Sequence, residues 1–142
     1  EYDLRLADLR KVAAAVGLDV VEEPPDEERW LGLTAKFRDE PERGRRCLVC
    51  YAVRLERTAA AASRDGYDVF TTVMSVSPHK SAAALNRMGR MFGRRFGVAF
   101  LEADFKKKDG FKKSVALSRR HNLYRQDYCG CLSSRRKESR AG

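Results

Sequence analysis

The sequence has no long apolar stretch, and no run approaches the roughly 18 residues that a transmembrane helix needs. It also lacks a charged leader with an apolar stretch and a small-residue cleavage site, so no recognisable signal directs secretion. The first residue is Glu1 rather than methionine, and we expect an N-terminal segment before it. The sequence therefore predicts a cytoplasmic protein that does not span a membrane.

Internal repeats, low-complexity linkers and a second-domain boundary are also lacking, and so is a glycine-rich phosphate loop. The 142 residues suffice for one hydrophobic core and are too few for two ordinary ones. Hydrophobic residues make up 43% of the chain and charged residues 35%, which fits a globular protein rather than a disordered one. We expect a single domain over residues 1–142, with residues 132–142 as a basic tail.

Charge is distributed unevenly along the chain. Residues 1–42 contain 12 acidic and 6 basic residues (net −6), whereas residues 43–142 contain 8 acidic and 23 basic residues (net +15). The basic residues of the second part form three groups: Arg43, Arg45 and Arg46; Lys106, Lys107, Lys108, Lys112 and Lys113; and Arg135, Arg136 and Lys137. Such groups attract polyanions at long range, so we expect a nucleic-acid partner.

Hydrophobic periodicity predicts helices that alternate with short strands. Helices are expected over residues 3–16, 26–39, 47–66, 80–96 and 110–121. Three apolar, β-branched runs are expected to be strands, at residues 18–21, 69–73 and 98–101. In the fourth helix, Ala83, Leu85, Met88, Met91 and Phe92 are expected to face the core.

This alternation predicts the α/β class, with a parallel sheet covered by helices on both faces. In open sheets of this kind, ligands bind beyond the carboxyl ends of the strands. Residues 74–80 and 104–106 follow two of the expected strands, so we expect both segments at the ligand-binding edge of the sheet.

The four cysteines form two close pairs, Cys47 with Cys50 and Cys129 with Cys131. Two residues separate the first pair, so on a helical turn both sulfurs lie on one face. Gly130 separates the second pair and supplies the backbone freedom to bring its sulfurs together. The 78 residues between the pairs exclude a local zinc finger. Neighbouring arginines favour the thiolate, which is both nucleophile and metal ligand.

Spacing alone leaves three chemistries open for these cysteines. They are a structural zinc site, an iron-sulfur cluster, and a metal-binding pair with a separate redox-active dithiol. A fourth interpretation gives the cysteines no chemical role and treats them as small apolar residues of the core.

Several motifs occur together in a characteristic order. They are Arg46-Cys47-x-x-Cys50-Tyr51, Thr71-Thr72, Ser77-Pro78-His79-Lys80, Phe105-Lys106-Lys107 and the run LYRQDYCGC at residues 123–131. Together they resemble the iron-sulfur, cobalamin-independent family of epoxyqueuosine reductases. The resemblance extends from the first helix to beyond Cys131, and the combination of the two cysteine motifs is its most specific part.

The resemblance implies an enzyme that reduces an epoxide on a modified base of the tRNA anticodon loop to an alkene, with loss of water. This is the last step of queuosine synthesis. It implies a fold similar to the adenine nucleotide alpha-hydrolase group, whose first strand is missing here and is expected before Glu1. It also implies a 4Fe-4S cluster with Cys47 and Cys50 as ligands, whereas the family's tandem cysteines have no counterpart in this sequence. We also expect that one metal ion can bind in addition to the cluster.

The resemblance further implies that Cys129 and Cys131 are a redox-active dithiol supplied by an electron donor. For the substrate tRNA, we expect phosphate contacts from Lys106, Lys107, Lys112, Lys113 and Arg125, and base stacking by Tyr124 and Tyr128. Two other classes stay open: a zinc-stabilised nucleic-acid-binding module without catalysis, and an RNA-modifying enzyme of the same fold group that uses ATP.

Overall fold

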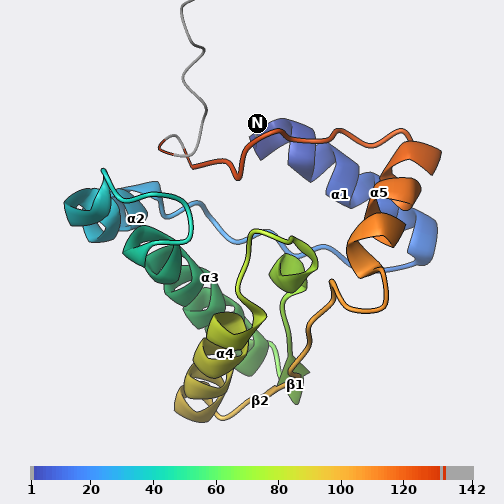
Figure 1. The fold of residues 1–142 in the computed structure, drawn as a ribbon. Coiled ribbons are helices and arrows are strands. Elements are labelled where there is room, and N and C mark those ends of the chain that lie inside the picture. The colour runs from blue at the N-terminus through green and yellow to red at the C-terminus, as the bar shows by residue number, and fades with distance from the viewer. Residues whose placement is uncertain (1, 132, 134–142) are drawn as a thin grey trace, which may run out of the picture. The chain divides into compact units, whose positions relative to one another are not determined.

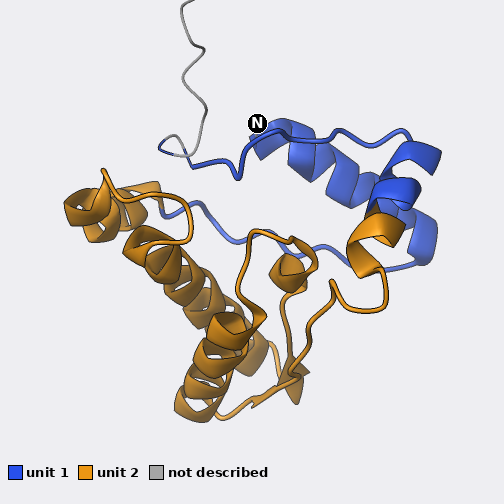
Figure 2. Ribbon diagram, viewed as in Figure 1, with its two compact units in different colours: residues 1–26, 115–142 blue, residues 27–114 orange. Residues whose placement is uncertain are grey.

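The structure, a computed structural model, describes residues 2–131 and 133 (Figure 1). It divides into two compact units, residues 1–26 with 115–142 as unit 1 and residues 27–114 as unit 2 (Figure 2). The expected single domain stays a prediction, and the tail residues Arg135, Arg136 and Lys137 lie outside the described residues. Within the described part of the chain, no helix has the length and apolar character that crossing a membrane requires.

Unit 2 contains the sheet. Its elements are α2 (Glu27–Thr34), the 3-10 helix η1 (Ala35–Phe37), α3 (Arg45–Arg64), β1 (Val69–Phe70), the 3-10 helix η2 (Val73–Val76), α4 (Ala82–Phe96) and β2 (Ala99–Phe100). β1 and β2 are parallel, with Val69 opposite Ala99 and Phe70 opposite Phe100. Parallel neighbours need a crossover, and α4 supplies it. The chain is therefore a mixed α/β protein with a small parallel sheet, as the alternation predicted.

The core of unit 2 is built on one stripe of α3. Residues three or four positions apart on this helix are buried together: Cys47, Tyr51, Leu55, Ala59 and Ala62. They form one cluster with Phe70 of β1, Leu85 and Phe92 of α4, and Val98. Helices α3 and α4 lie side by side in Figure 1 and contact each other over much of their length. Because Cys47 belongs to this stripe, packing fixes the position of its side chain.

Two glycines let α4 approach β2 closely. A Cβ atom on Gly89 would lie 2.4 Å from the Phe100 ring, and one on Gly93 would lie 2.5 Å from the carbonyl oxygen of Val98. This close contact sets which face of α4 is buried. Leu85 and Phe92 are buried as expected. The expectation was wrong for Met91, whose side chain is 53% exposed, and for Ala83, which is also exposed.

A Gly93→Ala variant of the full-length protein is expected to lose about 1–3 kcal/mol of unfolding free energy, because its methyl group meets backbone that cannot move aside. Gly32→Ala is the matched control, since nothing lies within 4 Å of its added Cβ in α2. That change should be neutral or stabilise by up to about 1 kcal/mol. Urea denaturation followed by circular dichroism measures both, and equal effects would contradict the packing argument.

Both strands are shorter than the sequence predicted. The expected strand at residues 69–73 stops after Phe70 because the Thr72 side chain starts a different element. Its Oγ1 accepts the Met74 N–H at 3.2 Å and thereby caps η2. Within the run at residues 98–101, only Ala99 and Phe100 are paired as strand.

Unit 1 contains α1 (Tyr2–Val16), which ends as predicted at Gly17, where φ is +68°. The expected strand at residues 18–21 was wrong, since this segment is irregular and Leu18 and Val21 are 66% and 65% exposed. A strand needs a neighbour to satisfy its backbone, and the described residues of unit 1 contain none. Helix α5 (Gly110–Arg120) confirms the predicted last helix and includes the boundary between the units.

Candidate functional site

The first cysteine pair lies in the first two turns of α3. Cys47 is 7% exposed, and Cys50 is half-buried. The backbone N–H of Arg43 donates a hydrogen bond to Cys47 Sγ at 3.3 Å. Arg43 makes this contact in a left-handed conformation, with φ at +75°, which costs a non-glycine residue strain of about 1 kcal/mol or more. Such a contact orients the sulfur of a metal ligand.

Two arginines and one carboxylate hold the start of α3. Arg46 is 3% exposed, and its Nη1 donates to the carbonyl oxygens of Phe37, Arg38 and Glu40 at 3.1, 2.8 and 2.5 Å. The Glu40 carboxylate accepts the backbone N–H and the guanidinium of Arg45. Desolvation raises the pKa of Glu40, but these hydrogen bonds outweigh it and lower the pKa below its usual value. The segment before Cys47 is therefore rigidly attached to the helix.

An Arg46→Met variant is expected to lose about 2–4 kcal/mol of unfolding free energy, because three carbonyl oxygens lose a charged donor in a buried place. Arg54→Met, an exposed position on the same helix, should stay within about 0.5 kcal/mol of the unsubstituted protein. Urea denaturation of the full-length protein compares the two. A loss below about 1 kcal/mol in Arg46→Met would show that the loop does not depend on this guanidinium.

The segments after β1 and β2 meet, as expected for the carboxyl ends of parallel strands. Ser75 is fully buried, and its Oγ accepts the Phe105 N–H at 3.2 Å. Lys106 Nζ donates to the carbonyl oxygens of Ser75 and Lys80, at 3.4 and 3.3 Å, and to Asp104 Oδ1 at 2.8 Å. The hydrogen bond from Lys106 holds the pKa of Asp104 below its usual value. Lys106 thus fastens the two loops to each other.

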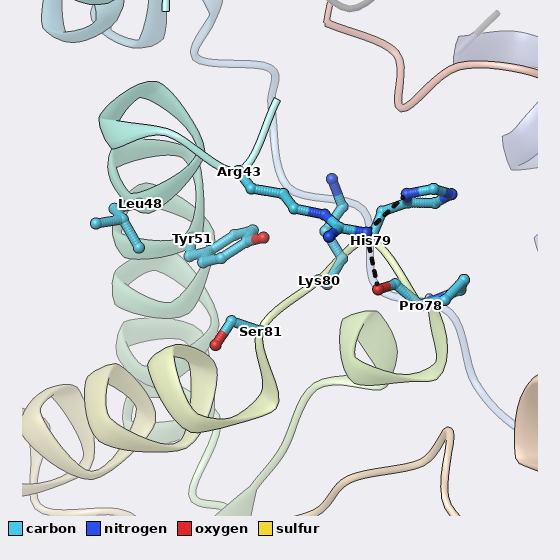
Figure 3. A pocket seen from close by; sticks show the side chains of 7 residues that line it. All are labelled: Arg43, Leu48, Tyr51, Pro78, His79, Lys80 and Ser81. Atoms are coloured by element: carbon cyan, nitrogen blue, oxygen red, sulfur yellow. Dashed lines mark hydrogen bonds between the residues drawn. The ribbon is translucent and has the colours of Figure 1, made fainter. Parts of the chain in front are cut away.

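A pocket of about 160 Å³ lies between α3 and the loop before α4 (Figure 3). It is lined by Arg43, Leu48, Tyr51, Pro78, His79, Lys80 and Ser81. Burial, assisted by the nearby charge of Cys47, raises the pKa of Tyr51 to about 12, against an opposing hydrogen bond from the Ser81 backbone. The Tyr51 phenol is therefore protonated at neutral pH.

The second cysteine pair lies in unit 1, in the segment that follows α5. Cys129 and Cys131 are half-buried, and Gly130 between them has φ at +94°. The Arg5 guanidinium donates from Nη1 to the carbonyl oxygen of Cys129 and from Nη2 to that of Tyr128, each at 3.3 Å. The positive φ of Gly130 favours glycine, and a Cβ there would also lie 2.8 Å from Arg5 Nη1, so the arginine side chain would have to shift.

Arg5 belongs to a row of three side chains on α1 that sequence analysis missed. Asp8 accepts the backbone N–H of Tyr124, and Lys11 Nζ donates to the carbonyl oxygen of His121 at 2.7 Å. Positions 5, 8 and 11 lie on one helical face, so the row holds the segment at residues 121–129 along α1. The spacing of three residues between these polar side chains could have indicated the row. The segment that they bind lies more than a hundred residues away in the sequence, so the spacing could not identify it.

The residues expected to contact tRNA lie in both units. In unit 2, Lys107, Lys112 and Lys113 are exposed, and Lys112 Nζ lies 3.2 Å from Asp109 Oδ1. Lys106 is half-buried in the contacts described above. In unit 1, Tyr124 and Arg125 are exposed, and Tyr128 is half-buried. Their contacts with RNA stay predictions.

None of the four cysteines forms a disulfide in this structure. Among residues 2–131 and 133, no group of three or more histidine, cysteine, aspartate or glutamate side chains could hold a metal ion. Cys47 and Cys50 fit two positions of a metal centre, because they lie about one helical turn apart on the same face of α3. In addition, Cys47 Sγ accepts a backbone N–H.

The small parallel sheet, the thiol pair at the start of a core helix and the second pair held by Arg5 define an α/β protein with two pairs of thiols. Residues 1–137 match the model of a family described as "Epoxyqueuosine reductase QueH". The chain belongs to this QueH family. This finding confirms the resemblance at the level of epoxyqueuosine reductases.

Curated relatives carry the same name. The chain is 38% identical over 96 residues to epoxyqueuosine reductase QueH of Streptococcus pyogenes, covering 68% of this chain and 38% of the relative. It is 34% identical over 128 residues to that of Staphylococcus epidermidis, covering 90% and 54%. It is 34% identical over 137 residues to the Thermotoga maritima protein, and this match covers 94% of the chain and 71% of that relative. The matched segments thus span 38% and 54% of the length of the first two relatives.

Proposed function

We propose that the full-length protein reduces epoxyqueuosine to queuosine in the anticodon loop of tRNA. The observation that carries this proposal is the family match over residues 1–137, which includes both cysteine pairs. The excess of basic residues after residue 42 supports a tRNA substrate, because phosphate contacts dominate the affinity of proteins for nucleic acids. The proposed reaction belongs to the reducing cytosol, where thiols stay reduced.

The Cys129–Cys131 pair is proposed to supply the electrons. Deoxygenation of the epoxide breaks both C–O bonds, forms a C=C bond, and releases the oxygen as water after it takes up two protons. It consumes two electrons, and oxidation of two thiols to one disulfide releases two electrons and two protons. An external electron donor then restores the dithiol. Arg5 holds the backbone on both sides of Cys129, so the pair is positioned before substrate arrives.

Cys47 and Cys50 are proposed to hold a 4Fe-4S cluster together with ligands that the structure does not describe. When bound, such a cluster supplies single-electron transfer or Lewis-acid activation of the epoxide oxygen. The chain's own part is structural. Arg43 donates its N–H to Cys47 Sγ, and Arg46 and Glu40 fix the start of α3 on which both sulfurs stand. One further metal ion, and an adenine nucleotide alpha-hydrolase-like fold for the whole protein, belong to the same proposal.

The decisive experiment incubates anaerobically purified full-length protein with tRNA that carries epoxyqueuosine and a chemical reductant, and detects queuosine by mass spectrometry. Iron, sulfide and zinc are measured on the same sample. We expect several irons per chain and conversion of the modified base. A protein that carries its cluster, binds the tRNA and forms no queuosine is not this enzyme. A colourless protein with one zinc and no product supports the zinc-stabilised binding module instead.

A further inference from the structure

The pocket in Figure 3 is lined by Arg43, whose backbone contacts Cys47 Sγ, and it has no part in the chemistry proposed above. We propose that it binds one phosphate group of the substrate RNA, an inference that rests on the proposed function for the source of the phosphate. The pocket encloses about 160 Å³. Pockets for drug-sized ligands measure about 300–1,000 Å³, so this one fits a group such as phosphate rather than a whole nucleoside.

Arg43 forms the donor-rich side of the pocket. Its side chain reaches from the segment before α3, two residues ahead of the helix, toward the loop that carries His79 (Figure 3). Nη2 donates to the carbonyl oxygen of Pro78 at 3.4 Å and lies 3.3 Å from His79 Nδ1. A guanidinium only donates hydrogen bonds, so His79 Nδ1 accepts this one. The pocket therefore offers a planar guanidinium, which matches the geometry of phosphate oxygens.

Lys80 supplies a second positive charge, and this charge is largely removed from water. Its side chain is 16% exposed, and the ion pair of its Nζ with Glu42 Oε1 is long, at 3.5 Å. The same Nζ lies 6.0 Å from the centre of the Tyr51 ring. A desolvated ammonium is costly unless an anion lies close to it. The Glu42 carboxylate, 39% exposed, supplies one such anion, and a phosphate in the pocket would add a second.

Helix α4 adds a smaller contribution to the same place. Ser81 lines the pocket and is the N-cap of this 15-residue helix, with its Oγ accepting the Ala84 N–H at 3.2 Å. The partial positive charge of a helix N-terminus favours an anion there. Two cationic side chains and a helix start thus converge on one small pocket.

Arg43 also links the pocket to the proposed metal ligands. Its backbone N–H donates to Cys47 Sγ, and its guanidinium lines the pocket. Phosphate contacts position a nucleic acid without reading its sequence. A phosphate bound here would therefore hold the RNA chain next to the first cysteine pair. The strained backbone of Arg43 would then serve two purposes: it would direct the N–H toward Cys47 Sγ and the guanidinium toward the phosphate.

The test measures the salt dependence of RNA binding by the full-length protein. The probe is an unmodified anticodon stem-loop RNA, with affinity followed by fluorescence anisotropy between about 50 and 200 mM salt. Arg43→Gln and Lys80→Gln should each reduce the slope of log affinity against log salt by about 0.7–1, the change expected for one lost phosphate contact. Arg43→Lys, which keeps the charge, should retain the slope. Arg87→Gln removes the same charge from an exposed position of α4 and should not change it.

Three outcomes overturn the proposal. Unchanged slopes in both pocket variants, with RNA still bound, exclude the phosphate site and leave the proposed function standing. Failure of the unsubstituted protein to bind RNA at all overturns the site and the proposed substrate together. A parallel titration with ATP separates the two sources of phosphate. If Arg43 and Lys80 are needed for ATP binding but not for RNA binding, the pocket serves a free nucleotide and the RNA assignment is wrong.

Discussion

A Cys47→Ala variant of the full-length protein is expected to lose its iron and, with it, all queuosine formation. Loss of a residue that only hydrogen-bonds to a metal ligand weakens metal binding by about 10- to 100-fold. Loss of the ligand itself should therefore weaken metal binding by more than about 100-fold. Cys47 is 7% exposed within the α3 core stripe, and the smaller alanine fits there. Iron and sulfide analysis after anaerobic reconstitution, with the visible absorption of the cluster, measures the effect.

Cys129→Ala is the matched control for this experiment. It removes the same sulfur from the other pair, and we expect its iron content to equal that of the unsubstituted protein. Cys50→Ala should behave like Cys47→Ala, because both sulfurs follow the same helical turn. Normal iron in Cys47→Ala would show that this pair does not hold the cluster. Loss of iron in Cys129→Ala would instead mean that all four cysteines are ligands of one centre.

A Cys131→Ser variant should keep its iron and lose turnover by on the order of 10³-fold or more, because a single thiol cannot form the disulfide that releases two electrons. The sharpest form of the experiment is a single turnover without added reductant. Pre-reduced unsubstituted protein should convert one epoxide per chain, and the peptide that contains Cys129 and Cys131 should lose two hydrogen atoms. Mass spectrometry of the RNA and of the peptide follows both events.

The control for this second prediction lies three residues upstream of Cys131. Tyr128→Phe removes a hydroxyl from the same segment without changing the thiols, and it should leave the oxidation of the peptide unchanged. If Cys131→Ser converts the epoxide at the normal rate with a chemical reductant, the electrons do not pass through this dithiol. If the peptide stays reduced while the product forms, the same conclusion holds for the unsubstituted protein.

Helices were predictable because their hydrogen bonds and hydrophobic faces are local. Four predicted helices agree with α1, α3, α4 and α5 to within about two residues, the usual uncertainty of helix ends. The N-terminal half of the remaining one agrees with α2, and the rest is irregular after η1. Strands depend on a neighbour that lies far away in the sequence. The run at residues 18–21 has strand-like composition but no partner, and Thr72 ends β1 by capping η2.

Faces of helices were less predictable than their bounds. Met91 was expected in the core because it is apolar, yet Gly89 and Gly93 are the residues that α4 turns toward β2. A glycine carries no hydrophobic signal, so periodicity cannot show that it marks the closest contact between two elements. The space that a missing Cβ leaves for the Phe100 ring becomes visible only when the strand is in place.

The sequence by itself determined the chemical groups: two thiol pairs, the basic excess, the helical turn that aligns Cys47 with Cys50, and the meeting of the segments after β1 and β2. Only the tertiary structure decided which side chains contact these groups and hold them in place. Arg5 and Cys129 are 124 residues apart, and Lys106 and Ser75 are 31 apart. Such contacts depend on long-range packing, which residue spacing does not encode. For this reason the two cysteine pairs were visible from the beginning, whereas the residues that hold them were found only in the folded chain.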